Sequence, residues 1–214
     1  MSDLATIRAT VRTDLHDEDP TDERWTDAEL DRHIRRALLE YSLRSPLEAK
    51  STLQTVAGSR DLAVSALASR VRIVAAEFPT GEYPPGYISF SLWGDTLTLH
   101  VTAAPTTAQD VNIYWHQAHS INGSSTFPVA HDDIIATGGA AYAALEWASF
   151  SSNRLNVGGD DVWGRYMEFA NVRLAAFKER LRQLPEVNRA KTARLYTPVD
   201  TRFTSETTDP GPGS

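Results

Sequence analysis

The sequence predicts an α+β fold, in which a bundle of about four helices carries an inserted antiparallel β subdomain and ends in an extended C-terminal tail. Apolar residues recur at helical spacing up to about residue 45, alternate as in strands from about 50 to 120, and return to helical spacing from about 131 to 184. After residue 185, Thr, Arg, Pro, Asp and Gly dominate, and such a segment buries too little apolar surface to order itself. The predicted parts are the N-terminal helices (1–49), the β insertion (50–120), the C-terminal helices (121–184) and the tail (185–214).

Two helices are predicted in the N-terminal part. Thr26 and Glu29 have the spacing of a capping box, which marks the start of the second helix. Trp25 precedes this cap, where a hydrophobic staple would pack it against Leu30. Pro46 ends the helix, because proline disfavours helical backbone in the preceding residue. The first helix carries its apolar face at four positions, namely Leu4, Ile7, Val11 and Leu15.

The β insertion contains one clear hairpin signal. Residues 88–92 and 97–101 alternate apolar and polar side chains, and Gly94 and Asp95 between them suit a two-residue turn. Further strands are predicted over 52–56, over 71–78 and over 111–115, whereas residues 62–69 remain ambiguous between strand and helical turn. Antiparallel strands with one apolar face predict a small sheet or barrel.

The C-terminal part predicts two more helices. Asp132 and Asp133 lie where a helix start favours negative charge. Gly138 and Gly139 lower helix propensity but let a neighbouring backbone approach closely. The last helix ends before Pro185 and keeps one apolar stripe over about six turns, formed by Trp163, Tyr166, Ala170, Leu174, Phe177, Leu181 and Leu184.

Composition excludes several classes of function. The formal net charge is −7, whereas a general nucleic-acid binder needs a basic surface. The chain contains no cysteine, which excludes disulfides and thiolate metal ligands. No apolar run reaches the ~18 residues of a membrane span, and the first residues lack the order of a signal peptide. The acidic residues crowd positions 14–31, where we expect a solvated loop and helix start.

No convincing catalytic or metal-ligating constellation is present. His116 and His119 are three apart on a predicted strand, which places them on opposite faces. His131 and Asp132 resemble a metal-binding pair of one phosphohydrolase class, but the other ligands of that class are not visible at suitable spacing. There is no G-x-S-x-G elbow, and the glycines at 158–159 lack the later glycine and the lysine of a phosphate loop. We therefore expect no enzymatic activity and no cofactor, and we expect three further histidines to be solvated, namely His16, His33 and His100.

Three aromatic residues of the β insertion allow a different interpretation. Trp93, Tyr114 and Trp115 would form a sugar-stacking platform if they were exposed beside polar groups. We expect the two tryptophans to pack the small sheet instead.

Several motifs, in their order along the chain, resemble the head–tail connector (adaptor) proteins of tailed bacteriophages and prophages. The resemblance begins with RWTDAEL at 24–30, which matches the W-[ST]-D-x-E-L helix start of that family, and continues with Ile34, Ala37 and Glu40. It extends through residues 83–90, WGDTLTL at 93–99 and Pro105 in the β part. HDDII at 131–135, GGAA at 138–141 and NVGG at 156–159 complete it. The similarity spans roughly residues 4–184.

This resemblance implies a structural role in the virion neck. Adaptors of that family form a ring, commonly of twelve subunits, beneath the capsid portal, where they extend the DNA channel and offer a platform to the next neck or tail protein. It implies three partners: the portal protein, the next neck or tail protein, and further copies of the chain. It also implies that DNA passes through without specific binding, that no membrane is involved, and that assembly takes place in the host cytoplasm. We expect the tail to dock on the portal or on a neighbouring subunit through Leu195, Tyr196, Val199 and Phe203.

The acidic stretch gains a physical interpretation from this role. A channel wall that repels phosphates lets DNA slide, whereas rings of Lys and Arg would hold it. We expect part of the stretch to face the lumen or the portal, namely Asp17, Glu18, Asp19, Asp22 and Glu23. Three alternatives remain: another neck component such as a stopper or tail terminator, a carbohydrate-binding module that uses Trp93, Tyr114 and Trp115, and a hydrolase that uses His131 and Asp132.

Overall fold

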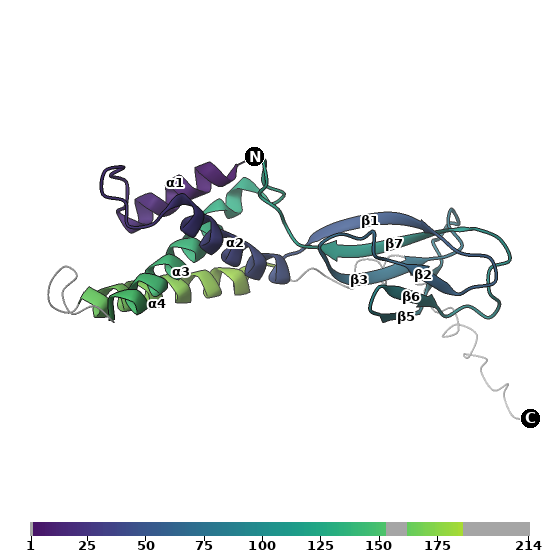
Figure 1. The fold of residues 1–214 in the computed structure, drawn as a ribbon. Coiled ribbons are helices and arrows are strands. Elements are labelled where there is room, and N and C mark those ends of the chain that lie inside the picture. Colours follow the sequence, from purple (N-terminus) through teal and green to yellow (C-terminus); the bar gives the residue numbers. More distant parts are fainter. Residues whose placement is uncertain (1, 153–161, 186–214) are drawn as a thin grey trace, which may run out of the picture. The chain divides into compact units, whose positions relative to one another are not determined.

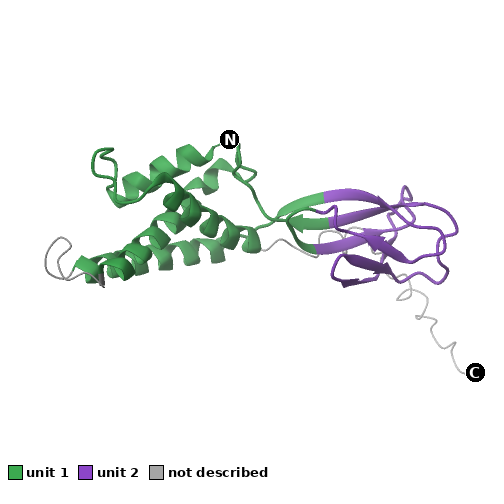
Figure 2. Cartoon of the chain, viewed as in Figure 1, with its two compact units in different colours: residues 1–49, 68–72, 115–187 green, residues 50–67, 73–114, 188–214 purple. Residues whose placement is uncertain are grey.

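The computed structural model describes residues 2–152 and 162–185 and confirms the α+β fold (Figure 1). The chain divides into two compact units, coloured separately in Figure 2. Unit 1 comprises residues 1–49, 68–72 and 115–187, and holds the four α-helices of the described part of the chain. Unit 2 contains residues 50–67 and 73–114, and holds most of the strands. The predicted docking residues of the tail and the glycines at 158–159 lie outside the described residues.

The two N-terminal helices form as predicted. Helix α1 (Leu4–Leu15) buries Ile7, Val11 and Leu15 on one face. Helix α2 (Asp27–Arg44) begins at the predicted capping box, in which Thr26 and Glu29 exchange side-chain to backbone hydrogen bonds. It ends at Ser45, directly before the proline.

Helix α3 (Asp132–Ser152) forms the centre of unit 1 and packs against α1, α2 and α4. All its residues from 134 to 144 are buried, as expected for a helix that is apolar on every side. Gly138 allows this packing, because a Cβ added there would lie 2.8 Å from the Cβ of Ala37 and 2.9 Å from a ring carbon of Phe177. At Gly139 the nearest atom, Ile34 Cγ1, would lie at 3.1 Å. The predicted close approach is therefore confirmed.

Helix α4 (Val162–Gln183) supplies the remaining apolar stripe of the helical core. Ala170, Phe177 and Leu181 are buried, as the sequence predicts. The stripe does not extend to the first turn, since Trp163 is half exposed. The guanidinium of Arg44 donates to the backbone carbonyls of Leu181 and Leu184, and thereby satisfies free acceptors at the end of this helix.

The strands form two sheets. The first has the order β1-β7-β3-β4 and contains β1 (Leu47–Gln54), β3 (Arg70–Glu77), β4 (Tyr87–Ile88) and β7 (Asp110–Gln117). The second has the order β2-β6-β5 and contains β2 (Asp61–Ala63), β5 (Phe90–Trp93) and β6 (Thr96–Leu99). Strands β5 and β6 form the predicted antiparallel hairpin, with Trp93 opposite Thr96 and Gly94 at a φ of 58°. The ambiguous residues 62–69 begin within strand β2, so the alternative of a helical turn there is wrong for residues 62–63.

Candidate assembly surfaces

The His131–Asp132 pair is part of the packing of unit 1. The Tyr41 hydroxyl lies 2.6 Å from Nδ1 of His131, and the two rings are in edge contact. Asp132 begins α3 and accepts a hydrogen bond from the Ser2 hydroxyl. Within residues 2–152 and 162–185, no three His, Asp or Glu side chains are grouped so that they could hold a metal ion.

Three other histidines are structural residues of the fold. His33 is buried on α2, which corrects the expectation that it is solvated, and its Nε2 donates to a Glu146 carboxylate oxygen at 2.5 Å. Burial lowers the pKa of His33 even though the carboxylate opposes this shift. His116 is buried and accepts a hydrogen bond from Arg72 at 2.9 Å, whereas His119 donates to the Ser45 carbonyl. Burial lowers the pKa of both side chains.

The three aromatic residues do not form a sugar-binding platform. Trp115 is buried on β7, so it offers no open ring face. The hydroxyl of Tyr114 donates to Glu77 at 2.6 Å. Trp93 is 90% exposed at the end of β5, which corrects the expectation that it packs the sheet. Of these three aromatic side chains, Trp93 is therefore the one with an almost fully exposed ring, and neither of the other two lies open beside it as a platform would require.

The acidic stretch is largely neutralised by arginines of the helical core. Asp17 is buried and lies 2.8 Å from Nη1 of Arg12, and its other carboxylate oxygen accepts from the backbone N–H of Arg24. Arg12 also contacts Asp27 at 2.8 Å. These ion pairs correct the expectation of a wholly solvated stretch, and Asp17 is no longer a candidate for a lumen-facing charge. The exposed acidic residues of the loop are Glu18, Asp19, Asp22 and Glu23.

Helix α2 presents an exposed apolar face. Leu39 is 55% exposed and Leu43 is 62% exposed, and their spacing of four places them on the same side of the helix. A groove of about 380 Å³ runs beside Leu39 and is also lined by Arg35, by Ser69 and by residues 118–122. Two exposed leucines beside a groove are typical of a surface that contacts another protein.

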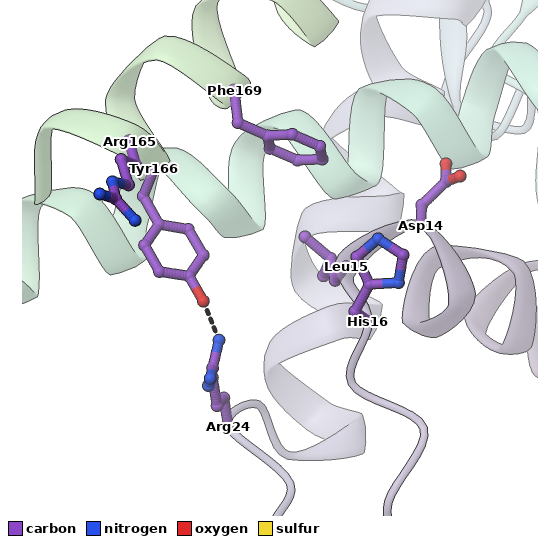
Figure 3. A pocket seen from close by; sticks show the side chains of 7 residues that line it. All are labelled: Asp14, Leu15, His16, Arg24, Arg165, Tyr166 and Phe169. Atoms are coloured by element: carbon purple, nitrogen blue, oxygen red, sulfur yellow. Dashed lines mark hydrogen bonds between the residues drawn. The ribbon is translucent and has the colours of Figure 1, made fainter. Parts of the chain in front are cut away.

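A second hollow, of about 240 Å³, lies between α1, the loop that follows it and α4 (Figure 3). Its apolar walls are Leu15, Phe169 and the ring of Tyr166. The Arg24 guanidinium hydrogen-bonds to the Tyr166 hydroxyl and lies 5.8 Å from the centre of that ring (Figure 3). Arg165 lines the hollow from the first turns of α4. His16 and Asp14 complete the lining.

The charges around this hollow are predominantly positive. Asp14 is paired with Arg173, whose guanidinium donates to it at 2.7 Å. Among the residues that the structure describes, neither Arg24 nor Arg165 has a carboxylate partner. The sequence gives no local signal for this hollow, because its lining residues belong to three separate segments. None of the described helices combines the length and the apolar character that a membrane crossing requires.

Comparison with known proteins identifies the family. The family model of the SU10 adaptor protein matches residues 2–202. A search of curated proteins finds no matching relative. A solved structure described as the neck of a native GTA particle, computed with C12 symmetry, is 16% identical, with 84% of this chain and 90% of that chain covered and a TM-score of 0.25. This score is too low for the arrangement of that particle to be transferred to this chain. The family match confirms the resemblance to adaptor proteins, and the chain therefore belongs to the SU10 adaptor protein family.

Proposed function

We propose that the chain forms a homo-oligomeric ring, of about twelve subunits, between the capsid portal and the tail, and that this ring extends the DNA channel. The observation that carries this proposal is the match to the adaptor family across residues 2–202. The ring works by contact surfaces and catalyses no reaction. Its subunits assemble on the portal in the host cytoplasm, and the completed ring offers a platform to the next neck or tail protein.

The exposed surfaces of the subunit support this role. In a closed ring each subunit meets its neighbours through two different faces. Unit 1 offers the α2 face with Leu39 and Leu43 and, separately, the hollow between α1 and α4. Unit 2 offers the exposed Trp93. Large exposed apolar side chains in both units are what a subunit needs to meet several partners.

The proposed channel wall uses the acidic loop between α1 and α2. Glu18, Asp19, Asp22 and Glu23 are exposed there, within a short segment that includes Pro20, and Glu23 is also paired with Arg12 at 3.2 Å. Exposed carboxylates repel the phosphates of passing DNA, with a range of about 8 Å at physiological salt. Asp17 contributes through the fold instead, because its ion pair with Arg12 holds the base of the loop.

The proposed contact with the portal or with the neighbouring subunit uses the C-terminal tail. Its apolar residues Leu195, Tyr196, Val199 and Phe203 are spaced along an otherwise polar segment. A segment of this composition can gain order from a partner and bury a large area for its length.

Co-sedimentation with purified portal rings tests the proposal. The full chain should bind in a fixed ratio to the portal and convert from a small species into a ring of defined mass. A variant that ends at residue 185 should keep the helical signal of the full chain but lose this co-assembly. A matched control in which Tyr196 and Phe203 are retained and Glu206 to Ser214 is removed should still assemble. If the full chain fails to form rings on the portal, the proposed function is wrong.

A further inference from the structure

We propose that the β5–β6 hairpin of one subunit inserts Trp93 into the hollow between α1 and α4 of the next subunit. This contact rests on the proposed ring, and it specifies which two faces of the subunit meet. We call the hollow lined by Leu15, Arg24, Arg165, Tyr166 and Phe169 the α1–α4 pocket.

The hairpin presents its tryptophan in a form suited to insertion. Trp93 is 90% exposed although it ends a strand that is hydrogen-bonded along its length to β6. The two-residue turn at Gly94 keeps the strand ends together, so the ring is held on a short and ordered projection. A tryptophan fixed in this way loses little conformational freedom on binding, and tryptophan is among the residues that contribute most to interfaces.

The chemistry of the α1–α4 pocket is complementary to an indole ring. Arg24 lies 5.8 Å from the centre of the Tyr166 ring and Arg173 lies 5.2 Å from the centre of the Phe169 ring. The parts of both rings that line the pocket favour a third ring at offset or edge-on geometry. Arg24 and Arg165 both line the pocket, and in Figure 3 they flank Tyr166, with Arg24 at its hydroxyl. Tryptophan is the best aromatic partner of such cations. Because Arg173 already neutralises Asp14, the net charge that faces an incoming ring is positive.

The size of the pocket also fits this occupant. A cavity of about 150 Å³ accommodates a benzene molecule. The α1–α4 pocket, at about 240 Å³, is larger by an amount suited to the second ring of an indole.

The two faces are different, as a ring requires. A projecting hairpin on one subunit and a receiving pocket on the next form a heterologous contact, which repeats around an axis until the ring closes. An isologous dimer would instead use each pair of faces twice and stop at two subunits.

Disulfide cross-linking tests the contact directly, because the chain has no cysteine of its own. Thr96→Cys places a thiol on the hairpin opposite Trp93, and Arg165→Cys places one at the pocket while Arg24, Tyr166 and Phe169 remain. When the two single variants are mixed with portal rings and oxidised, they should give a linked pair of subunits. The double variant should give a ladder that ends at the closed ring. The matched control replaces Thr96→Cys by Tyr83→Cys, which is 92% exposed elsewhere in unit 2 and should not cross-link.

A second variant measures the contribution of the tryptophan itself. Trp93→Ala should fold like the original chain, because the side chain is exposed, and should weaken ring assembly at least about 30-fold. Tyr83→Ala should leave assembly unchanged. Rings that form normally with Trp93→Ala and without the Thr96–Arg165 cross-link would overturn this inference and leave the proposed function intact. A cross-link within a single subunit would also overturn this inference, as would a loss of portal binding without any link between subunits. Failure of the original chain to form rings would overturn both this inference and the proposed function.

Discussion

Gly138 is the residue at which a single added carbon should be most informative about the helical core. Alanine there would place its Cβ 2.8 Å from the Cβ of Ala37 and 2.9 and 3.0 Å from two ring carbons of Phe177. Both neighbours are fully buried, and carbon atoms normally pack at about 3.5–4.0 Å. One of the helices or the phenylalanine ring must therefore shift.

The expected cost follows from two opposing effects. Overpacking a core by one carbon costs about 1–3 kcal/mol, and three atoms within 3.0 Å, two of them on a buried ring, favour the upper half of that range. Alanine recovers about 1 kcal/mol of helix propensity relative to glycine. Gly138→Ala should therefore lower the free energy of unfolding of the helical unit by about 1–2 kcal/mol. This loss corresponds to a decrease of about 2–8 °C in the midpoint of thermal unfolding.

Gly139→Ala is the matched control on the adjacent residue. Its added Cβ would meet side-chain carbons of Ile34 and Val11 at 3.1 and 3.3 Å, so a small adjustment suffices and the propensity gain offsets it. Urea unfolding followed by circular dichroism at 222 nm measures both variants. If Gly138→Ala proves as stable as Gly139→Ala, or more stable than the original chain, the described packing of α3 against α2 and α4 is wrong.

Three further predictions concern stability and titration. Thr26→Ala removes the side-chain acceptor of the capping box and should cost about 1 kcal/mol in urea unfolding, whereas an unchanged midpoint would contradict the cap geometry. Burial lowers the pKa values of His33, His116 and His119, so on acidification the unfolded chain binds protons at a higher pH than the folded chain. The free energy of unfolding should therefore be fully retained above pH 6.5 and should fall as the pH decreases below it. His33→Gln should make this decrease less steep. Burial raises the pKa of Tyr142 to about 12, so the free energy of unfolding should fall as the pH rises from 10 towards 12. In Tyr142→Phe, the absorbance titration at 295 nm should lose an ionisation step near pH 12.

The sequence predicts those features of the fold that depend on local pattern. The capping box at Thr26, the end of α2 before Pro46, the close approach at Gly138 and the turn at Gly94 each arise from a few neighbouring residues. Strand β1 is less predictable, because it starts at Leu47, with only two residues between it and the end of α2, and its alternating positions are only half-buried.

The exposure and pairing of the surface residues cannot be predicted from local sequence patterns, because they depend on contacts between distant segments of the chain. Asp17 is indistinguishable in sequence from its acidic neighbours, and Arg12 and the Arg24 backbone together explain why it is buried. His33 follows the charged Asp31 and Arg32 in sequence, yet it is buried and its imidazole is hydrogen-bonded to Glu146 of another helix. The exposure of Trp93 violates the usual tendency of a strand tryptophan to pack, and such a violation often marks a surface that serves another molecule.

Electron microscopy of the chain bound to purified portal rings tests the central claim most directly. We predict particles in which a single additional layer of this chain sits on the portal, with the rotational symmetry of a closed ring and a continuous central channel. Particles that carry isolated subunits or two-fold dimers at the portal, or no additional layer, would contradict the account.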